Sequence, residues 1–131
     1  MSYPVGLIQI NVTDVRKAKE FYVDTLGFKA ADENFGGVVI LENTNGAPIL
    51  IYPTERAVQV DYPSQTGPLL VFHVENIEHT IQDWTSKGVE FIKISFADDE
   101  SGVATCPFGR FIAFRDPFGN VHEILQPHPA A

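Results

Sequence analysis

The stretch RDPFGNVHEILQ, Arg115–Gln126, has the composition of a tight turn followed by a strand. Asp116 can accept backbone hydrogen bonds, Pro117 fixes a turn φ, and Gly119 or the residue after it can adopt a positive φ. The strand that follows carries one acidic side chain, Glu123, among apolar ones. The stretch therefore predicts a hairpin that ends in a strand, and Glu123 is a metal ligand, a catalytic carboxylate or a solvated residue.

Upstream of this hairpin the chain repeats one supersecondary unit. LIQINVTDV, starting at Leu7, aligns with LLVFHVENI, starting at Leu69, at an offset of 62 residues. Each copy predicts a strand that leads into a helix, with a capping residue at Thr13 or Asp14 in the first copy and at Asn76 in the second. A unit used twice indicates two half-sheets.

Each copy continues with three apolar, β-rich runs. They lie near residues 29–34, 37–42 and 48–53 in the first copy, and in VEFIKISF, RFIAFR and NVHEILQ in the second. Residues 54–67 contain Pro, Ser and Gly without strong periodicity and are interpreted as a linker. The prediction is a single α+β domain, 1–131, with a βαβββ module over about 5–53 and another over about 68–126.

Composition excludes several classes of partner. The chain has 131 residues, 44% of them apolar, and a net charge of −8. Such an acidic chain is repelled by nucleic acids and by anionic membranes, and no apolar run approaches the roughly 18–20 residues of a membrane span. The start of the chain lacks the features of a signal peptide, so we expect a cytoplasmic protein. Cys106, the single cysteine, is expected to be a small buried hydrophobe.

The segments VTDVRKAKEFYVDTLGF and FRDPFGNVHEILQ, together with the duplication, resemble the vicinal oxygen chelate superfamily. That group includes glyoxalase I, extradiol dioxygenases and the fosfomycin- and bleomycin-resistance proteins. The resemblance extends from about Val5 to Gln126. It implies an eight-stranded, barrel-like curved sheet with a concave ligand cup, and a homodimer. One fold hosts many functions, so the resemblance does not define an activity.

Active members of this family hold a divalent metal ion with side chains from four strands. The resemblance places these four positions at Leu7, Leu69, Glu123, and either Ile49 or Leu50. Leucine and isoleucine cannot bind a metal, and one carboxylate with waters holds a transition metal only weakly. We therefore expect neither a metal nor another cofactor.

Alternation along strands predicts which side chains share the face of these four positions. That face is expected to be an apolar cup with a few polar, ligand-binding side chains, an arrangement typical of small-molecule sites. The predicted ligand-binding residues are Gln9, Asn11, Tyr52, His73 and Glu123.

Three functions follow from these expectations. The first is a metal-free protein that binds a small organic molecule of cationic or aromatic character in the cup. The second is a lyase- or isomerase-like enzyme in which Glu123, with or without His73, acts as general acid or base. The third is a domain retained only for assembly. Loss of turnover with retained ligand affinity in a Glu123→Gln variant would separate the second function from the first.

Overall fold

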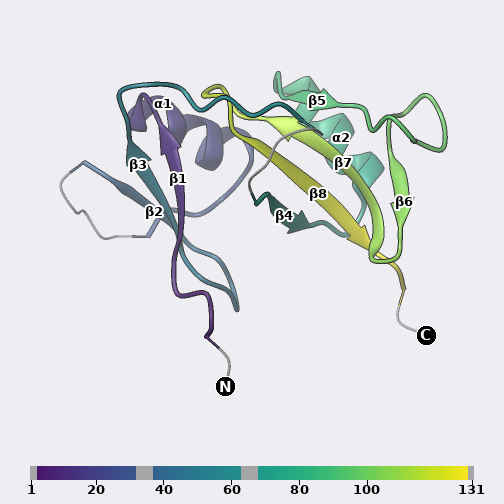
Figure 1. The fold of residues 1–131 in the computed structure, drawn as a ribbon, viewed down its shortest axis with the longest axis horizontal. Coiled ribbons are helices and arrows are strands. Elements are labelled where there is room, and N and C mark those ends of the chain that lie inside the picture. Colours follow the sequence, from purple (N-terminus) through teal and green to yellow (C-terminus); the bar gives the residue numbers. More distant parts are fainter. Residues whose placement is uncertain (1–2, 32–36, 63–67, 130–131) are drawn as a thin grey trace. The chain divides into compact units, whose positions relative to one another are not determined.

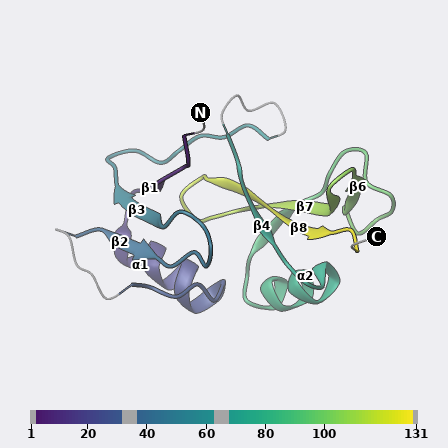
Figure 2. The same cartoon turned by 90° about the horizontal axis from the view of Figure 1, so that it is seen from below.

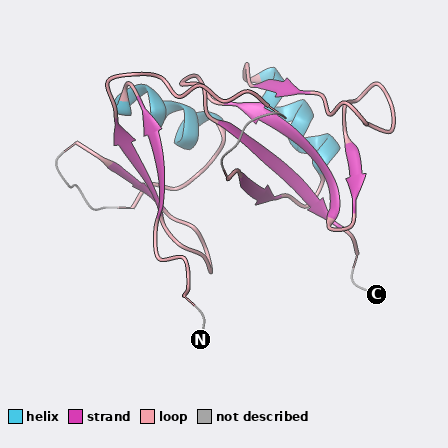
Figure 3. Ribbon diagram, in the orientation of Figure 1, coloured by secondary structure: helices cyan, strands magenta, loops and turns pink. Residues whose placement is uncertain are grey.

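The computed structural model describes residues 3–31, 37–62 and 68–129. The chain divides into two compact units, unit 1 (Met1–Gln59) and unit 2 (Val60–Ala131), and the boundary lies within the predicted linker. Figure 1 and Figure 3 show the helices and strands of both units. These elements are β1 (Ile8–Val12), α1 (Val15–Lys19), the π-helical η1 (Glu20–Thr25), β2 (Val39–Leu41), β3 (Ile49–Pro53), β4 (Leu70–His73), α2 (Ile77–Ser86), β5 (Glu90–Ile92), β6 (Ala104–Cys106), β7 (Gly109–Arg115) and β8 (Val121–Pro127).

Unit 1 is a three-stranded sheet in the order β1-β3-β2, packed on one face against α1 and η1 (Figure 2). Strand β1 runs parallel to β3, and β2 runs antiparallel to it. Alternate side chains of the sheet and one side of the helix are buried together, as expected for a half-covered sheet. The core consists of Ile10, Val12, Ala18, Tyr22, Leu26, Leu41, Ile49 and Ile51.

The helix of unit 1 begins and ends where the sequence predicts. The Asp14 side chain accepts a hydrogen bond from the amide of Lys17 at 3.0 Å, and Gly27 ends the helix with a φ of +92°. One residue more separates Asp14 from Gly27 than separates Asn76 from Gly88 in the second copy. A π-helical turn fits an extra residue between the same two ends, which accounts for η1.

Unit 2 is a five-stranded sheet in which β4, β8, β7 and β5 follow in order and β6 pairs with β7. Helix α2 covers one face, which we call the helix face. There the ring of Trp84 meets the ring of Phe114 at a centroid distance of 5.2 Å, and the Gln126 side chain accepts a hydrogen bond from the amide of Ile77 at 2.9 Å. The opposite side, the open face, carries the side chains of Phe111, Ala113, Val121, Glu123 and Leu125.

The two units share one pairing pattern, although over the described residues unit 1 has three strands and unit 2 has five rather than the four strands predicted for each module. In each unit the first strand pairs in parallel with the last strand. Gln9 lies opposite Leu50 in unit 1, and Val71, at the 62-residue offset from Gln9, lies opposite Glu123 in unit 2. Leu50 is therefore the counterpart of Glu123. Of the two residues left open by the sequence, Leu50 shares the face of Gln9, whereas Ile49 is buried under the helix.

Several details differ from the prediction. The run near 29–34 contributes only an isolated bridge between Ala30 and Leu41, and its residues 32–34 lie outside the described part of the chain. VEFIKISF forms a strand only as far as Ile92. Strand β6 was not predicted. Over the described residues the strands form two sheets and no closed barrel, so the α+β class is confirmed and the barrel-like sheet is not.

The turn DPFGN forms the predicted hairpin between β7 and β8. Oδ1 of Asp116 accepts hydrogen bonds from the amides of Phe118 and Asn120 at 2.9 and 2.8 Å. Oδ2 accepts another from Nδ2 of Asn120 at 2.7 Å. Gly119 has a φ of +91°. The buried Asp116 carboxylate therefore accepts the hydrogen bonds of turn amides for which the tight turn offers no backbone carbonyl.

No helix in the described ranges combines the length and apolar character needed to cross a bilayer.

His122 lies on the helix face and is buried. Its ring sits beside the rings of Phe72 and Phe114, at centroid distances of 5.6 and 5.4 Å. Burial lowers the pKa of His122 from 6.5 to about 4, and the nearby Asp116 carboxylate offsets only part of this effect. The imidazole is therefore neutral at physiological pH and contributes to the core.

The depressed pKa of His122 predicts loss of stability in mild acid. Below pH 6.5 the unfolded chain binds a proton at this ring that the folded chain does not bind, so folding stability falls until the pH reaches about 4. Between pH 7 and pH 5 the free energy of unfolding should fall by about 2 kcal/mol from this residue alone. Urea titrations should show the fall in the wild type and a flatter profile in His122→Leu. Equal profiles in the two proteins would contradict this assignment.

Candidate functional site

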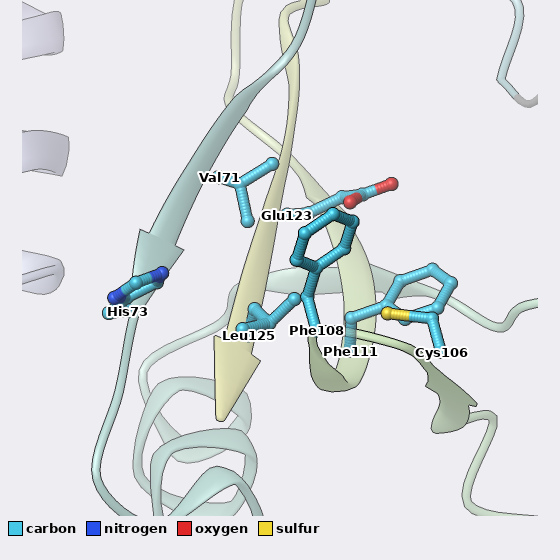
Figure 4. Close-up of a pocket in the computed structure, with 7 residues that line it drawn as sticks. All are labelled: Val71, His73, Cys106, Phe108, Phe111, Glu123 and Leu125. Atoms are coloured by element: carbon cyan, nitrogen blue, oxygen red, sulfur yellow. The ribbon is translucent and has the colours of Figure 1, made fainter. Parts of the chain in front are cut away.

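The open face of unit 2 holds a pocket of about 420 Å³ (Figure 4). Its floor comes from β4, β7 and β8, and its rim comes from β6 and the β6–β7 turn. All but two of its side chains are apolar, and two of them are aromatic rings. The lining residues are Val71, His73, Cys106, Phe108, Phe111, Glu123 and Leu125. The pocket has the apolar walls and few polar groups of a small-molecule site.

The carboxylate of Glu123 is held by a phenol. The hydroxyl of Tyr62 donates a hydrogen bond to Oε2 of Glu123 at 2.9 Å. Burial, together with this hydrogen bond, raises the pKa of Tyr62 well above its ordinary value of 10.0. The phenol therefore stays protonated and acts as the donor. Within the described ranges no Lys, Arg or His nitrogen forms an ion pair with Glu123, so the partner orients the carboxylate without neutralising it.

Tyr62 reaches Glu123 because the short segment that it ends, Val60–Tyr62, packs on the open face. Nη1 of Arg115 donates a hydrogen bond to the carbonyl of Val60 at 3.2 Å. The side chains of Val60 and Tyr62 pack against the apolar cluster around Val121 and Ala113. The sequence prediction assigned this segment to a linker and missed Tyr62. The available signal was the apolar alternation of Val58, Val60 and Tyr62, which is typical of an extended segment with one covered face.

His73 and Glu123 both line the pocket but lie at different places along it. Glu123 is opposite Val71, whereas His73 is opposite Leu125, two residues further along the strand pair. This step corresponds to roughly 7 Å. In Figure 4 the carboxylate of Glu123 points away from the imidazole of His73. The structure thus places the two predicted acid/base residues in one pocket without a hydrogen bond between them.

The aromatic rim is fixed by the end of β8 and the residue that follows it. Gly109, next to Phe108, lies so close to the carbonyl of Gln126 that a Cβ would collide with it. The ring nitrogen Nε2 of His128 is 2.8 Å from the carbonyl oxygen of Cys106. The described part of the C-terminal segment therefore holds the β6–β7 hairpin, and Phe108 keeps its side chain 77% exposed at the mouth of the pocket. Cys106 is half-buried rather than fully buried.

The other predicted ligand-binding residues all lie in unit 1. Gln9 and Asn11 lie on the face that the helix leaves open, and Nε2 of Gln9 donates to Oδ1 of Asn11 at 2.9 Å. Tyr52 is opposite Asn11, and its side chain is 43% exposed. The structure thus brings Gln9, Asn11 and Tyr52 together, beside Leu50.

Of the four positions at which the family resemblance places metal ligands, one carries a side chain that can bind a metal. Leu7 and Leu50 occupy the two positions of unit 1, and Leu69 packs against the apolar cluster of unit 2. Glu123 is the single oxygen donor of the four. Hydrocarbon side chains have no lone pair for a metal, so the donor set does not fit a divalent ion. Among the residues described, no three His, Cys, Asp or Glu side chains gather into a potential metal site.

A model of the glyoxalase/bleomycin resistance protein/dioxygenase superfamily matches residues 5–124. The chain belongs to this superfamily. A full-length curated relative, the uncharacterized protein YetH of Bacillus subtilis, is 27% identical over 127 residues, which cover 93% of this chain and 97% of YetH. The family assignment confirms the resemblance seen in the two sequence segments.

Solved structures share the fold of this superfamily member. TnmS3, an antibiotic binding protein from a Streptomyces species, matches with a TM-score of 0.68 at 24% identity and covers 98% of each chain. The fosfomycin resistance protein FosX of Listeria monocytogenes matches with a TM-score of 0.73 at 15% identity, covering 98% of this chain and 96% of FosX. At these identities the likeness concerns the fold alone.

The hydrogen bond between Tyr62 and Glu123 predicts an energetic coupling. In a double-mutant cycle with Tyr62→Phe and Glu123→Met, urea unfolding should give a coupling energy of about 1 kcal/mol, since a hydrogen bond to a partly exposed carboxylate contributes about that much. The matched pair Tyr62→Phe with Glu100→Gln, at an exposed glutamate outside the pocket, should give no coupling. A coupling near zero for the first pair would refute the contact.

Proposed function

We propose that the protein is a metal-free small-molecule binding protein that holds a cationic, aromatic ligand in the pocket of unit 2. The observation that carries the proposal is the Glu123 carboxylate, which lies in an apolar, aromatic pocket and is oriented by Tyr62 rather than paired with a base. Such a site offers one negative charge and flat apolar surface to the same ligand.

The electrostatics of the pocket favour a cation. An ionised carboxylate accepts hydrogen bonds and donates none, so it selects a ligand with N–H or O–H donors. A positively charged donor forms the stronger, charge-assisted hydrogen bond. The rings of Phe108 and Phe111 supply apolar contact for an aromatic group, and ring faces also attract cations. The net charge of −8 attracts cations to the protein as a whole.

The family supports a binding function of this kind. TnmS3 is an antibiotic binding protein, and another neighbour of the fold is a glyoxalase/bleomycin resistance protein from a Streptomyces species. The latter matches with a TM-score of 0.63 at 23% identity. TnmS3 supports the use of this fold for binding an organic molecule, and the pocket chemistry described above is the basis for proposing the same use here.

The metal-free part of the proposal follows from the donor set, in which leucines replace three of four ligands. Protein purified without chelators, from medium supplemented with Zn²⁺, Ni²⁺ and Mn²⁺, should carry much less than one equivalent of transition metal by elemental analysis. Glu123→Gln should carry the same residual amount. A stoichiometric metal that is lost in Glu123→Gln would overturn the metal-free assignment.

The ligand class can be tested with 2-naphthylmethylamine, which carries a bicyclic ring and an ammonium group, and with 2-naphthylmethanol, its neutral analogue. NMR titration of the wild type should show tighter binding of the amine. Glu123→Gln should weaken amine binding about five- to tenfold, because it removes a charge-assisted hydrogen bond, and should leave the alcohol nearly unchanged. The control Glu100→Gln also removes one negative charge and should change amine affinity less than about twofold.

Two results would contradict this proposal. One is the absence of amine binding to the wild type at millimolar concentration, and the other is equal weakening of amine and alcohol in Glu123→Gln.

The alternative of an acid/base enzyme stays a prediction, and turnover distinguishes it from binding alone. Its substrate would be consumed by the wild type, whereas Glu123→Gln would bind that substrate without turnover.

A further inference from the structure

The two oxygens of the Glu123 carboxylate are not equivalent. Oε2 accepts the hydrogen bond from Tyr62, and within the described ranges Oε1 has no hydrogen-bonding partner. The Tyr62 ring is part-buried and packs against the apolar cluster of the open face, so the phenol is fixed by more than this hydrogen bond. The backbone of its segment is held by Arg115 at Val60. One oxygen therefore already accepts a hydrogen bond from the protein, and among the described residues the other keeps its acceptor sites for a ligand in the pocket that Glu123 lines.

Cationic groups differ in how many carboxylate oxygens they use. A guanidinium or amidinium is planar and pairs with a carboxylate through two parallel N–H···O hydrogen bonds, one to each oxygen. An ammonium is a compact charge whose N–H donors can each bind a single oxygen. A carboxylate with one oxygen already bound to a neutral donor suits the second geometry, because a planar two-point donor has to share Oε2 with the phenol.

We propose that Tyr62 is a specificity-determining residue that restricts Glu123 to one-point pairing, so that the pocket selects alkylammonium ligands over amidinium and guanidinium ligands of the same size. This inference rests on the proposed function, since it requires a cationic ligand at Glu123. It assigns to Val60–Tyr62 the role of covering one half of the carboxylate. Because the phenol of Tyr62 is uncharged, its hydrogen bond leaves the Glu123 carboxylate with the negative charge that attracts an ammonium. The same hydrogen bond occupies Oε2 and so disfavours two-point pairing.

The matched probes are 2-naphthylmethylamine and 2-naphthamidine, which share the bicyclic ring and the single positive charge and differ in one-point against two-point donation. Dissociation constants for both are measured by NMR titration on the wild type, Tyr62→Phe and the control Tyr3→Phe, which removes an exposed hydroxyl of unit 1. The readout is the ratio of the two constants. A general loss of pocket structure weakens both probes and leaves this ratio unchanged.

The wild type is expected to bind the amine more tightly than the amidine. In Tyr62→Phe the ratio should shift by roughly fivefold toward the amidine, because the second oxygen becomes available for a hydrogen bond between charged groups. Tyr3→Phe should keep the wild-type ratio.

An unchanged ratio in Tyr62→Phe, with the amine still weakened by Glu123→Gln, overturns the role of Tyr62 and leaves the proposed function intact. Failure of both probes to bind the wild type overturns the proposed function and this inference together. A Tyr62→Phe protein that fails to fold is replaced by Tyr62→Met, which also lacks a donor, and the same ratio decides the outcome.

Discussion

The parallel pairing of the first and last strands within each unit is the constraint on which the site depends. Side chains alternate along strands, so this register decides which residues face away from the helix. In unit 2 it places Glu123 opposite Val71 and Leu125 opposite His73. In unit 1 the same register places Leu50 opposite Gln9. A shift of one residue in β8 would bring His122 to the open face and bury Glu123 under α2.

The hydrogen bond between Tyr62 and Glu123 orients the carboxylate on the open face without adding a positive charge beside it. A lysine or arginine partner would have neutralised the carboxylate and closed the site to cations. A phenol holds the carboxylate in place and leaves its charge uncompensated. Leucine stands at three of the four positions where the family resemblance places metal ligands, which supports the proposed metal-free function. What remains is an oriented anion among aromatic and aliphatic side chains, which suits binding better than catalysis by a metal.

The sequence predicted those parts of the structure that depend on local rules. The caps at Asp14 and Asn76 and the turn at Asp116 follow from short-range chemistry, and the structure confirms them. Tyr62 was missed because its role depends on tertiary contact. A segment without a strand partner gives only weak periodicity, which is typical of a linker. The π-helical turn escaped prediction for a similar reason, since only comparison of the two helices reveals the extra residue.

The central claim is that the pocket of unit 2 binds an organic cation at Glu123 without a metal. A crystal structure of the protein grown with 2-naphthylmethylamine tests it most directly. The account predicts the ammonium nitrogen within hydrogen-bond distance of Oε1 of Glu123, with the Tyr62 hydroxyl still on Oε2 and the naphthyl ring against Phe108 and Phe111. An amine bound elsewhere, or a metal ion coordinated by Glu123, would contradict it.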